Sequence, residues 1–243
     1  MSRNRLTTGR SFPCHGRTGR NCKVCVRVRR GCCFMAVFPP DLFQRCFGMV
    51  IGVIGGVGAG KSTVLETLEK KYGFRVLKTD DIAKSFYISG NPVFEKLKEL
   101  LGEDIEREDG RVNIPAFAKK LYGGDKEDIR KKVDDIVHPA VWDYVSEQVE
   151  SSCGDVVVET ALPNERFLRM CHEVWAVVTD CDVRVERLMK TRGYTEKKAR
   201  DMILSQIGDE EYSGMATFII DNSGTPEEAI RAIEGHMKQA NTD

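Results

Sequence analysis

The chain reads Met49-Val-Ile-Gly-Val-Ile54, then Gly55-Gly-Val-Gly-Ala-Gly60-Lys61-Ser62-Thr63, then Val64-Leu-Glu-Thr-Leu-Glu-Lys70. The first part is an apolar run, the last is helix-like, and the middle matches the pattern G-x-x-x-x-G-K-[ST]. A triphosphate needs several inward-pointing backbone N–H groups, and glycine permits the tight turn that gathers them because it accepts positive φ. The helix N-terminus that follows also favours an anion. The pattern therefore predicts a phosphate-binding loop between a strand and a helix.

Each position of this loop has an expected role. Lys61 would reach the β and γ phosphates of ATP, and the Ser62 hydroxyl would bind Mg²⁺. The remaining nucleotide contacts are expected from the loop itself, at Gly55, Gly58, Ala59, Gly60 and Thr63. The alternative is a glycine-rich turn that binds nothing, which the strand–loop–helix context disfavours.

Charge and cysteine content divide the chain at Met49. Residues 1–48 contain ten Lys or Arg and one acid, Asp41, whereas residues 49–243 carry an acidic excess of nine. Six of the nine cysteines precede Met49, and the others are scattered singles without a disulfide framework, so a reduced, cytoplasmic compartment is expected. No apolar run approaches the ~20 residues of a membrane span, so no membrane partner is expected.

The first 48 residues permit several interpretations. Cys22-x-x-Cys25 with Cys32-Cys33 could bind zinc, although the second pair is adjacent and not spaced. An Arg-rich composition could also serve as a transit peptide or hold nucleic acid through phosphate contacts. The favoured interpretation is a disordered or spurious extension with Met49 as the natural start, and no nucleic-acid partner. Detection of residues 1–48 in the native protein by mass spectrometry would contradict it.

Alternating apolar runs and helical patterns fill residues 49–243. Strands are expected at 49–54, 74–77, 155–159, 173–178 and 218–221. Helical segments lie between them, so the sequence predicts a three-layer α/β fold around a five-stranded parallel, doubly wound sheet. Further helices at 93–101, 114–121 and 128–149 form an insertion, about residues 80–150, that is expected to bind the acceptor.

Carboxylates follow the second and third strands. Ligands of open α/β sheets gather at this edge, so Asp80 is the candidate general base that takes the proton of an acceptor hydroxyl. The alternative for Asp80 is a helix N-cap, which is the preferred interpretation of Asp81. Glu159 ends the third strand and is expected to orient Mg²⁺ through water or to contact the acceptor. His138, before Pro139, is a structural histidine by preference, with substrate contact left open.

The segment at about 181–210 has the character of a lid. A helix over 181–192 ends at Gly193, and a second follows over 195–206. Arg187 and Arg192 are predicted to close over the phosphates and stabilise the transferring group, whereas Arg184 is assigned to a solvated charged face.

The last strand and the last helix are joined by a short polar turn. Asn222 and Gly224, directly after the strand, are candidate contacts to the adenine base, and an ordinary turn explains them equally well. Thr225-Pro-Glu-Glu228 predicts a capping box that opens the final helix.

Seven motifs together resemble dephospho-CoA kinase, a P-loop NTPase family. They are Ile54-Gly-Gly-Val-Gly-Ala-Gly-Lys-Ser62, Thr79-Asp-Asp-Ile-Ala-Lys84, Asp109-Gly-Arg-Val112, His138-Pro-Ala-Val141, Val158-Glu-Thr-Ala-Leu162, Arg187-Leu-Met-Lys-Thr-Arg192 and Ile219-Ile-Asp-Asn-Ser-Gly224. The resemblance runs from about Met49 to the final helix. It implies transfer from ATP to the 3′-hydroxyl of the dephospho-CoA ribose, the last step of CoA synthesis, with Asp80 as base. Lys78 and Lys84 stand where the family commonly has Asp and Arg; for Lys84, a phosphate contact to the substrate is implied.

Two other functions remain open at this point. One is another P-loop kinase, acting on nucleotides or nucleosides, and the other is an ATP-binding switch module. The guanine-specifying N-K-x-D is absent from the sequence, which disfavours a GTPase. A monomer or weak homo-oligomer is expected.

Overall fold

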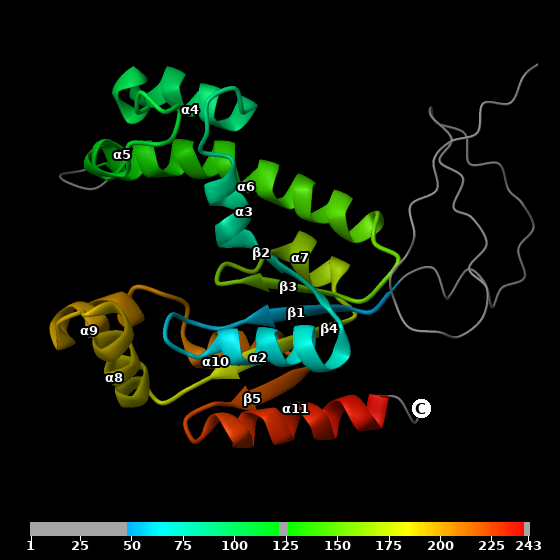
Figure 1. Ribbon diagram of the computed structural model, residues 1–243. Coiled ribbons are helices and arrows are strands. Elements are labelled where there is room, and N and C mark those ends of the chain that lie inside the picture. The colour runs from blue at the N-terminus through cyan, green and yellow to red at the C-terminus, as the bar shows by residue number, and fades with distance from the viewer. Residues whose placement is uncertain (1–47, 122–125, 241–243) are drawn as a thin grey trace, which may run out of the picture. The chain divides into compact units, whose positions relative to one another are not determined.

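The structure is a computed structural model that describes residues 48–121 and 126–240. The predictions made for the N-terminal extension lie outside this range. Within it, five parallel strands form one sheet in the order β2-β3-β1-β4-β5 (Figure 1). The strands are β1 (Val50–Ile54), β2 (Arg75–Lys78), β3 (Val156–Thr160), β4 (Glu173–Val178) and β5 (Phe218–Asp221). The predicted parallel sheet is therefore confirmed.

Helices connect the strands and form the insertion. They are α2 (Lys61–Thr67), a π-helical turn η1 (Leu68–Tyr72), α3 (Thr79–Ser85), α4 (Pro92–Leu101), a 3₁₀ turn η2 (Glu103–Ile105), α5 (Ile114–Leu121), α6 (Glu127–Glu150), α7 (Glu165–Met170), α8 (Cys181–Arg192), α9 (Glu196–Leu204), α10 (Asp209–Met215) and α11 (Pro226–Ala240). Gly73 ends the first helical segment in the left-handed conformation, at φ 79°. The capping box at α11 is half formed, since the Glu228 carboxylate accepts from the Thr225 N–H at 2.9 Å.

The side chains of β1 alternate between two cores because successive residues of a strand face opposite sides of the sheet. Ile51 and Val53 belong to a core that α2 and α11 cover. Val50 and Ile54 belong to a second core, to which α3, α7 and α10 contribute. The sheet is thus the middle of three layers, as predicted.

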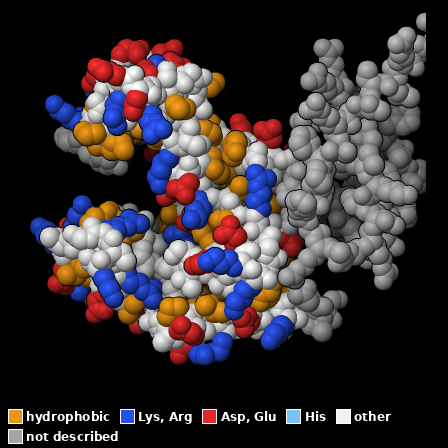
Figure 2. All heavy atoms as spheres, viewed as in Figure 1, with side chains coloured by type: hydrophobic (Ala, Val, Ile, Leu, Met, Phe, Trp, Pro, Cys, Tyr) orange, Lys and Arg blue, Asp and Glu red, His pale blue; other side chains and the backbone are white. Residues whose placement is uncertain are grey.

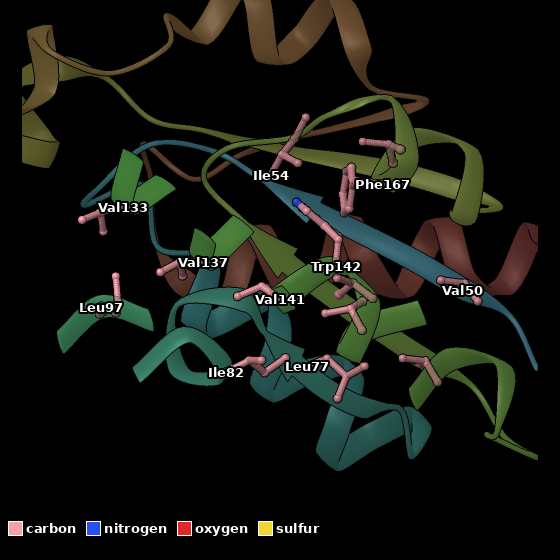
Figure 3. Close-up of a cluster of buried hydrophobic side chains, with 14 of the residues drawn as sticks. Val50, Ile54, Leu77, Ile82, Leu97, Val133, Val137, Val141, Trp142 and Phe167 are labelled. Atoms are coloured by element: carbon pink, nitrogen blue, oxygen red, sulfur yellow. The ribbon is translucent and has the colours of Figure 1, made fainter. Parts of the chain in front are cut away.

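The second core continues into the helical insertion. Val133, Val137 and Val141 recur every four residues along α6 and are buried, so one face of this helix lies against the core. Figure 3 shows these valines in one cluster with Leu97 from α4. This continuity attaches the predicted acceptor-binding helices to the sheet.

Three predicted strands need corrected bounds. β2 spans residues 75–78 and β3 residues 156–160, each one residue later than predicted, because Lys78 pairs in register with Glu159 and Thr160 with Ile54 of β1. β1 begins at Val50 and not at Met49. The short helices α7 and α10 were not predicted.

In the described part of the chain, no helix has both the length and the apolar character needed to cross a membrane.

Replacing glycine by alanine is expected to have opposite effects on stability at Gly52 and Gly235. A Cβ added to Gly52, in the central strand, would come within 2.4 Å of the Phe167 ring and 2.7 Å of the Cys171 sulfur. We therefore expect Gly52→Ala to lower the free energy of unfolding by about 1–3 kcal/mol through overpacking. Gly235 is exposed inside α11 with no atom within 4 Å of an added Cβ, so Gly235→Ala should raise it by about 0.5–1 kcal/mol. Urea unfolding checks both values, and equal stability of the two variants would contradict the packing argument.

Candidate active site

A cleft of about 710 Å³ opens at the carboxyl edge of the sheet, in the size range of small-molecule sites. The loop between β1 and α2, the first residues of α3, the end of β3 and the helices α8 and α9 contribute to its walls. In Figure 2 the visible face is hollowed beside α8 and α9, and Lys and Arg side chains border the hollow. Most of the predicted site residues line this cleft: Gly58, Gly60, Lys61, Ser62, Thr63, Asp80, Lys84, Glu159, Arg187, Arg192 and Asn222.

The loop has the geometry that an anion requires. Gly55, Gly58 and Gly60 adopt positive φ of 146°, 77° and 88°, a region that favours glycine. The backbone N–H groups of Gly58, Gly60, Lys61 and Ser62 donate to no other group among residues 48–121 and 126–240. Because α2 begins at Lys61, these donors stand at a helix N-terminus. The residues present therefore fit a nucleotide phosphate.

The carbonyl group of Ala59 holds the loop in place. It accepts hydrogen bonds from the Thr179 hydroxyl at 2.9 Å and from Asn222 Nδ2 at 2.8 Å, and Arg187 Nη1 lies at 3.5 Å. Ala59 itself is fully buried. Thr179, after β4, and Asn222, after β5, thus hold the loop through the Ala59 carbonyl group. Thr179 was not among the predicted residues, since a lone threonine after a strand carries no distinctive signal.

Lys61 bridges the loop and β3. Its Nζ donates to the carbonyl oxygens of Gly55 at 2.8 Å and Gly56 at 3.3 Å, and it pairs with Glu159 Oε1 at 3.3 Å. Both side chains are mostly buried. The ammonium group is therefore held within the cleft, on the loop that the free N–H groups line.

Burial raises the pKa of the Glu159 carboxyl group above its ordinary value. The Lys61 ammonium opposes this shift, the Asp80 carboxylate adds to it, and the Lys78 ammonium lowers the pKa again. All four charged residues line the cleft, so their charges influence one another there: Glu159, Lys61, Lys78 and Asp80.

The raised pKa of Glu159 predicts a pH-dependent stability. The folded chain binds this proton more tightly than the unfolded chain, so the carboxyl group costs stability progressively as pH rises from about 4 toward the folded pKa. Glu159→Gln removes this titration. We expect the free energy of unfolding of the variant, minus that of wild type, to grow between pH 4 and pH 7 in urea titrations. A difference that shrinks as pH rises would contradict it.

Asp80 lies in the first turn of α3, exposed and lining the cleft. The prediction that Asp81 caps this helix is wrong: the N-cap is Lys78, no side chain caps the helix, and Asp81 pairs with Lys84 at 3.1 Å. The reason is that α3 starts at Thr79, so both carboxylates are already inside the helix, near its positive end. Asp80 is left facing the cleft without an ion-pair partner in the described residues.

The three arginines of α8 differ in their surroundings. Arg187 Nη2 donates to the Asn222 carbonyl at 2.8 Å, and Arg192 is exposed at the end of α8; both line the cleft. The assignment of Arg184 to a solvated face is wrong, because its side chain is buried and pairs with Asp209 at 3.1 Å. Gln206, which sequence reasoning missed, accepts from the Val57 N–H at 2.7 Å.

Three of the predicted contact residues, Gly55, Ala59 and His138, do not line the cleft. His138 is exposed on α6, 3.7 Å from Asp134, and does not line the cleft, so its contact with substrate stays a prediction. Asn222 lines the cleft, but its side chain is buried against the loop, so its role toward the adenine base also stays a prediction. No group of three or more His, Cys, Asp or Glu in the described ranges could hold a metal. A Mg²⁺ ion held mostly by phosphates and waters needs no such group, and Ser62 remains the predicted ligand.

Comparison with known proteins gives consistent results. A family model described as dephospho-CoA kinase matches residues 49–228. The dephospho-CoA kinase of Oceanobacillus iheyensis is 31% identical over 202 residues, which cover 79% of this chain and 98% of that protein. The dephospho-CoA kinase of Staphylococcus epidermidis is 31% identical over 179 residues, covering 72% of this chain and 87% of that protein.

Solved structures share the architecture. The crystal structure of TT1252 from Thermus thermophilus has a TM-score of 0.64 and 27% identity, and covers 79% of this chain and 98% of that one. A dephospho-CoA kinase from Campylobacter jejuni has a TM-score of 0.57 and 20% identity over 79% of this chain and 98% of that one, which supports the fold alone.

Proposed function

This chain belongs to the dephospho-CoA kinase family, and from that premise we propose that its cleft transfers the γ-phosphoryl group of ATP to the 3′-hydroxyl of the dephospho-CoA ribose. The products are CoA and ADP, and the reaction is the last step of CoA biosynthesis. One observation carries the proposal: the free N–H groups of the phosphate loop and the Asp80 carboxylate line the same cleft. A phosphoryl donor and a hydroxyl acceptor can meet between them.

The nucleotide side of the cleft supplies positioning and positive charge. Phosphoryl transfer needs little covalent help from the protein, so donors aimed at the phosphate oxygens supply most of the catalysis. The loop N–H groups cradle the phosphates, and Lys61 exchanges the carbonyls of Gly55 and Gly56 for phosphate oxygens. Arg187 and Arg192 add charge from the lid side.

The acceptor side supplies a base. Asp80 takes the proton of the ribose hydroxyl as the oxygen attacks the γ phosphorus, which keeps the nucleophile from accumulating positive charge. Lys78 and Lys84 line the cleft beside it and are placed to attract the anionic pyrophosphate of dephospho-CoA. The Glu159 carboxylate pairs with the Lys61 ammonium group and keeps it beside the loop.

Ser62 is the residue proposed to hold Mg²⁺, and Glu159, which lines the same cleft, would orient the waters of the ion. When bound, this ion neutralises charge that develops on the β and γ phosphates. The Ser62 side chain is exposed to the cleft at the start of α2, so the donor set fits the ion.

The assay that tests the function measures ADP release from ATP and Mg²⁺ on addition of dephospho-CoA, with AMP and adenosine as control acceptors. ADP release that requires dephospho-CoA supports the proposal. Stimulation by AMP or adenosine instead would favour another small-molecule kinase, and bound ATP without any stimulation would favour the switch module. Full-length protein and a chain that starts at Met49 are compared, and equal rates would make residues 1–48 dispensable.

Cytoplasmic location and a monomeric or weakly associating state are proposed on the same basis. Cys171 and Cys181 are free thiols within the described part of the chain, which fits a reduced compartment. Sedimentation across a range of concentrations would test the oligomeric state.

A further inference from the structure

Two glycines of the phosphate loop occupy positions that its pattern leaves open. The motif fixes Gly55 and Gly60 and permits any residue at the four positions between them. A Cβ added to Gly56 would lie 2.1 Å from Arg184 Nη2 and 2.9 Å from Arg184 Cζ. One added to Gly58 would lie 3.2 Å from the Arg184 carbonyl oxygen and 3.3 Å from Leu188 Cγ. The close approach of α8 therefore explains why both positions are glycine.

Arg184 is the residue that fills this space. Its side chain is 3% exposed, and its Nε donates to the Val57 carbonyl at 2.9 Å while Nη1 pairs with Asp209 Oδ1 at 3.1 Å. Its Nη2 is buried without a hydrogen-bond partner in the described part of the chain. Arg184 does not line the cleft, although it contacts the loop that does. A buried guanidinium is costly unless it is paired and hydrogen-bonded, and the loop supplies part of that compensation.

The backbone N–H and the carbonyl group of Val57 both form hydrogen bonds with residues outside the loop. Arg184 binds its carbonyl, and Gln206, after α9, accepts from its N–H at 2.7 Å. The Asp209 partner opens α10, whose Tyr212 hydroxyl donates to the Ala161 carbonyl at 2.8 Å, beside Glu159 in the cleft wall. The segment 56–58 is thus hydrogen-bonded directly to α8 and to the residues after α9, and it is linked to α10 through Arg184.

We propose that Arg184 and Asp209 are a positioning pair that holds the Gly56–Gly58 segment in the conformation that binds the ATP phosphates, and that Gly56 is glycine to admit the Arg184 guanidinium. The inference rests on the proposed nucleotide site. It predicts an effect on ATP and not on the acceptor, because the side-chain hydrogen bonds that Arg184 makes within residues 48–121 and 126–240 go to the loop and to α10. Neither residue lines the cleft.

Isothermal titration with ATP and Mg²⁺ tests the pair without any acceptor. We expect Arg184→Ala to weaken ATP binding about tenfold, since a loop hydrogen bond to a charged donor is lost. Arg184→Lys should recover only part of the loss, because one ammonium cannot serve Val57 and Asp209 as the planar guanidinium does. The control is Arg200→Ala, an exposed lid arginine paired with Asp182 and Glu196, which should bind ATP as wild type does. In the kinase assay the KM for dephospho-CoA should stay within about twofold.

A double-mutant cycle separates positioning from general loss of stability. Gly56→Ala should weaken ATP binding in the wild-type background and add almost nothing to Arg184→Ala, because the atoms that its Cβ would strike are gone. Equal costs in both backgrounds, or wild-type ATP affinity in Arg184→Ala, would overturn the inference. Either result leaves the proposed function standing if dephospho-CoA is phosphorylated, and failure with dephospho-CoA leaves the ATP measurements valid.

Discussion

Asp80→Asn is expected to lower kcat by about a thousandfold while the KM for ATP stays within about twofold. The amide has the size of the carboxylate and still accepts a hydrogen bond from the acceptor hydroxyl, but it cannot take the proton. Asp80 lies outside the phosphate loop, on the first turn of α3, so ATP binding should be unaffected. Initial rates at saturating ATP and dephospho-CoA, with ATP affinity by calorimetry, measure both quantities.

The matched control for this change is Asp128→Asn. Asp128 is also an exposed carboxylate in the first turn of a helix, α6, but it does not line the cleft. Its replacement should leave kcat unchanged, since a surface charge near a helix N-terminus affects stability by about 0.3–1 kcal/mol only. If Asp81→Asn abolished activity and Asp80→Asn retained it, the general base would be Asp81 and not Asp80.

Elements with clear end signals could be predicted from the sequence to the residue. The α8 helix runs from Cys181 to Arg192 as predicted, because Gly193 ends it in the left-handed conformation at φ 64°. β4 and β5 also have their predicted bounds, as apolar runs between polar segments. The helices α7 and α10 contain six and seven residues, too few for a 3.6-residue period to repeat.

Some residues in and around the candidate site could likewise be predicted from local sequence, and others could not. The cleft position of Gly58, Gly60, Lys61 and Asp80 could be predicted, because it depends on local sequence at the carboxyl ends of β1 and β2. Arg184 could not, because its burial depends on Val57 and Asp209, 127 and 25 residues away along the chain. The surrounding residues of α8 are strongly charged, which favours a solvated face. The only local signal was the pair of extra glycines at 56 and 58, which the phosphate motif does not require.

Lys61→Met should lower kcat/KM for ATP by about a thousandfold, because the β and γ phosphates lose their cation in the transition state. It should also destabilise the free protein by about 1–3 kcal/mol, since Glu159 is left mostly buried without its ion-pair partner and the loop carbonyls of Gly55 and Gly56 lose a donor. Kinase rates and urea unfolding measure the two effects separately. Lys70→Met is the control, because Lys70 is exposed and pairs with Glu66 at the surface.

The double variant Lys61→Met/Glu159→Gln distinguishes the chemical role of Lys61 from its structural role. Removing the carboxylate removes the uncompensated charge, so stability at pH 7 should return toward that of wild type. Activity should not return, because no group in the double variant replaces the ammonium at the phosphates. If activity recovered together with stability, the loss in Lys61→Met would reflect only a disturbed cleft, and Lys61 would have no direct part in phosphoryl transfer.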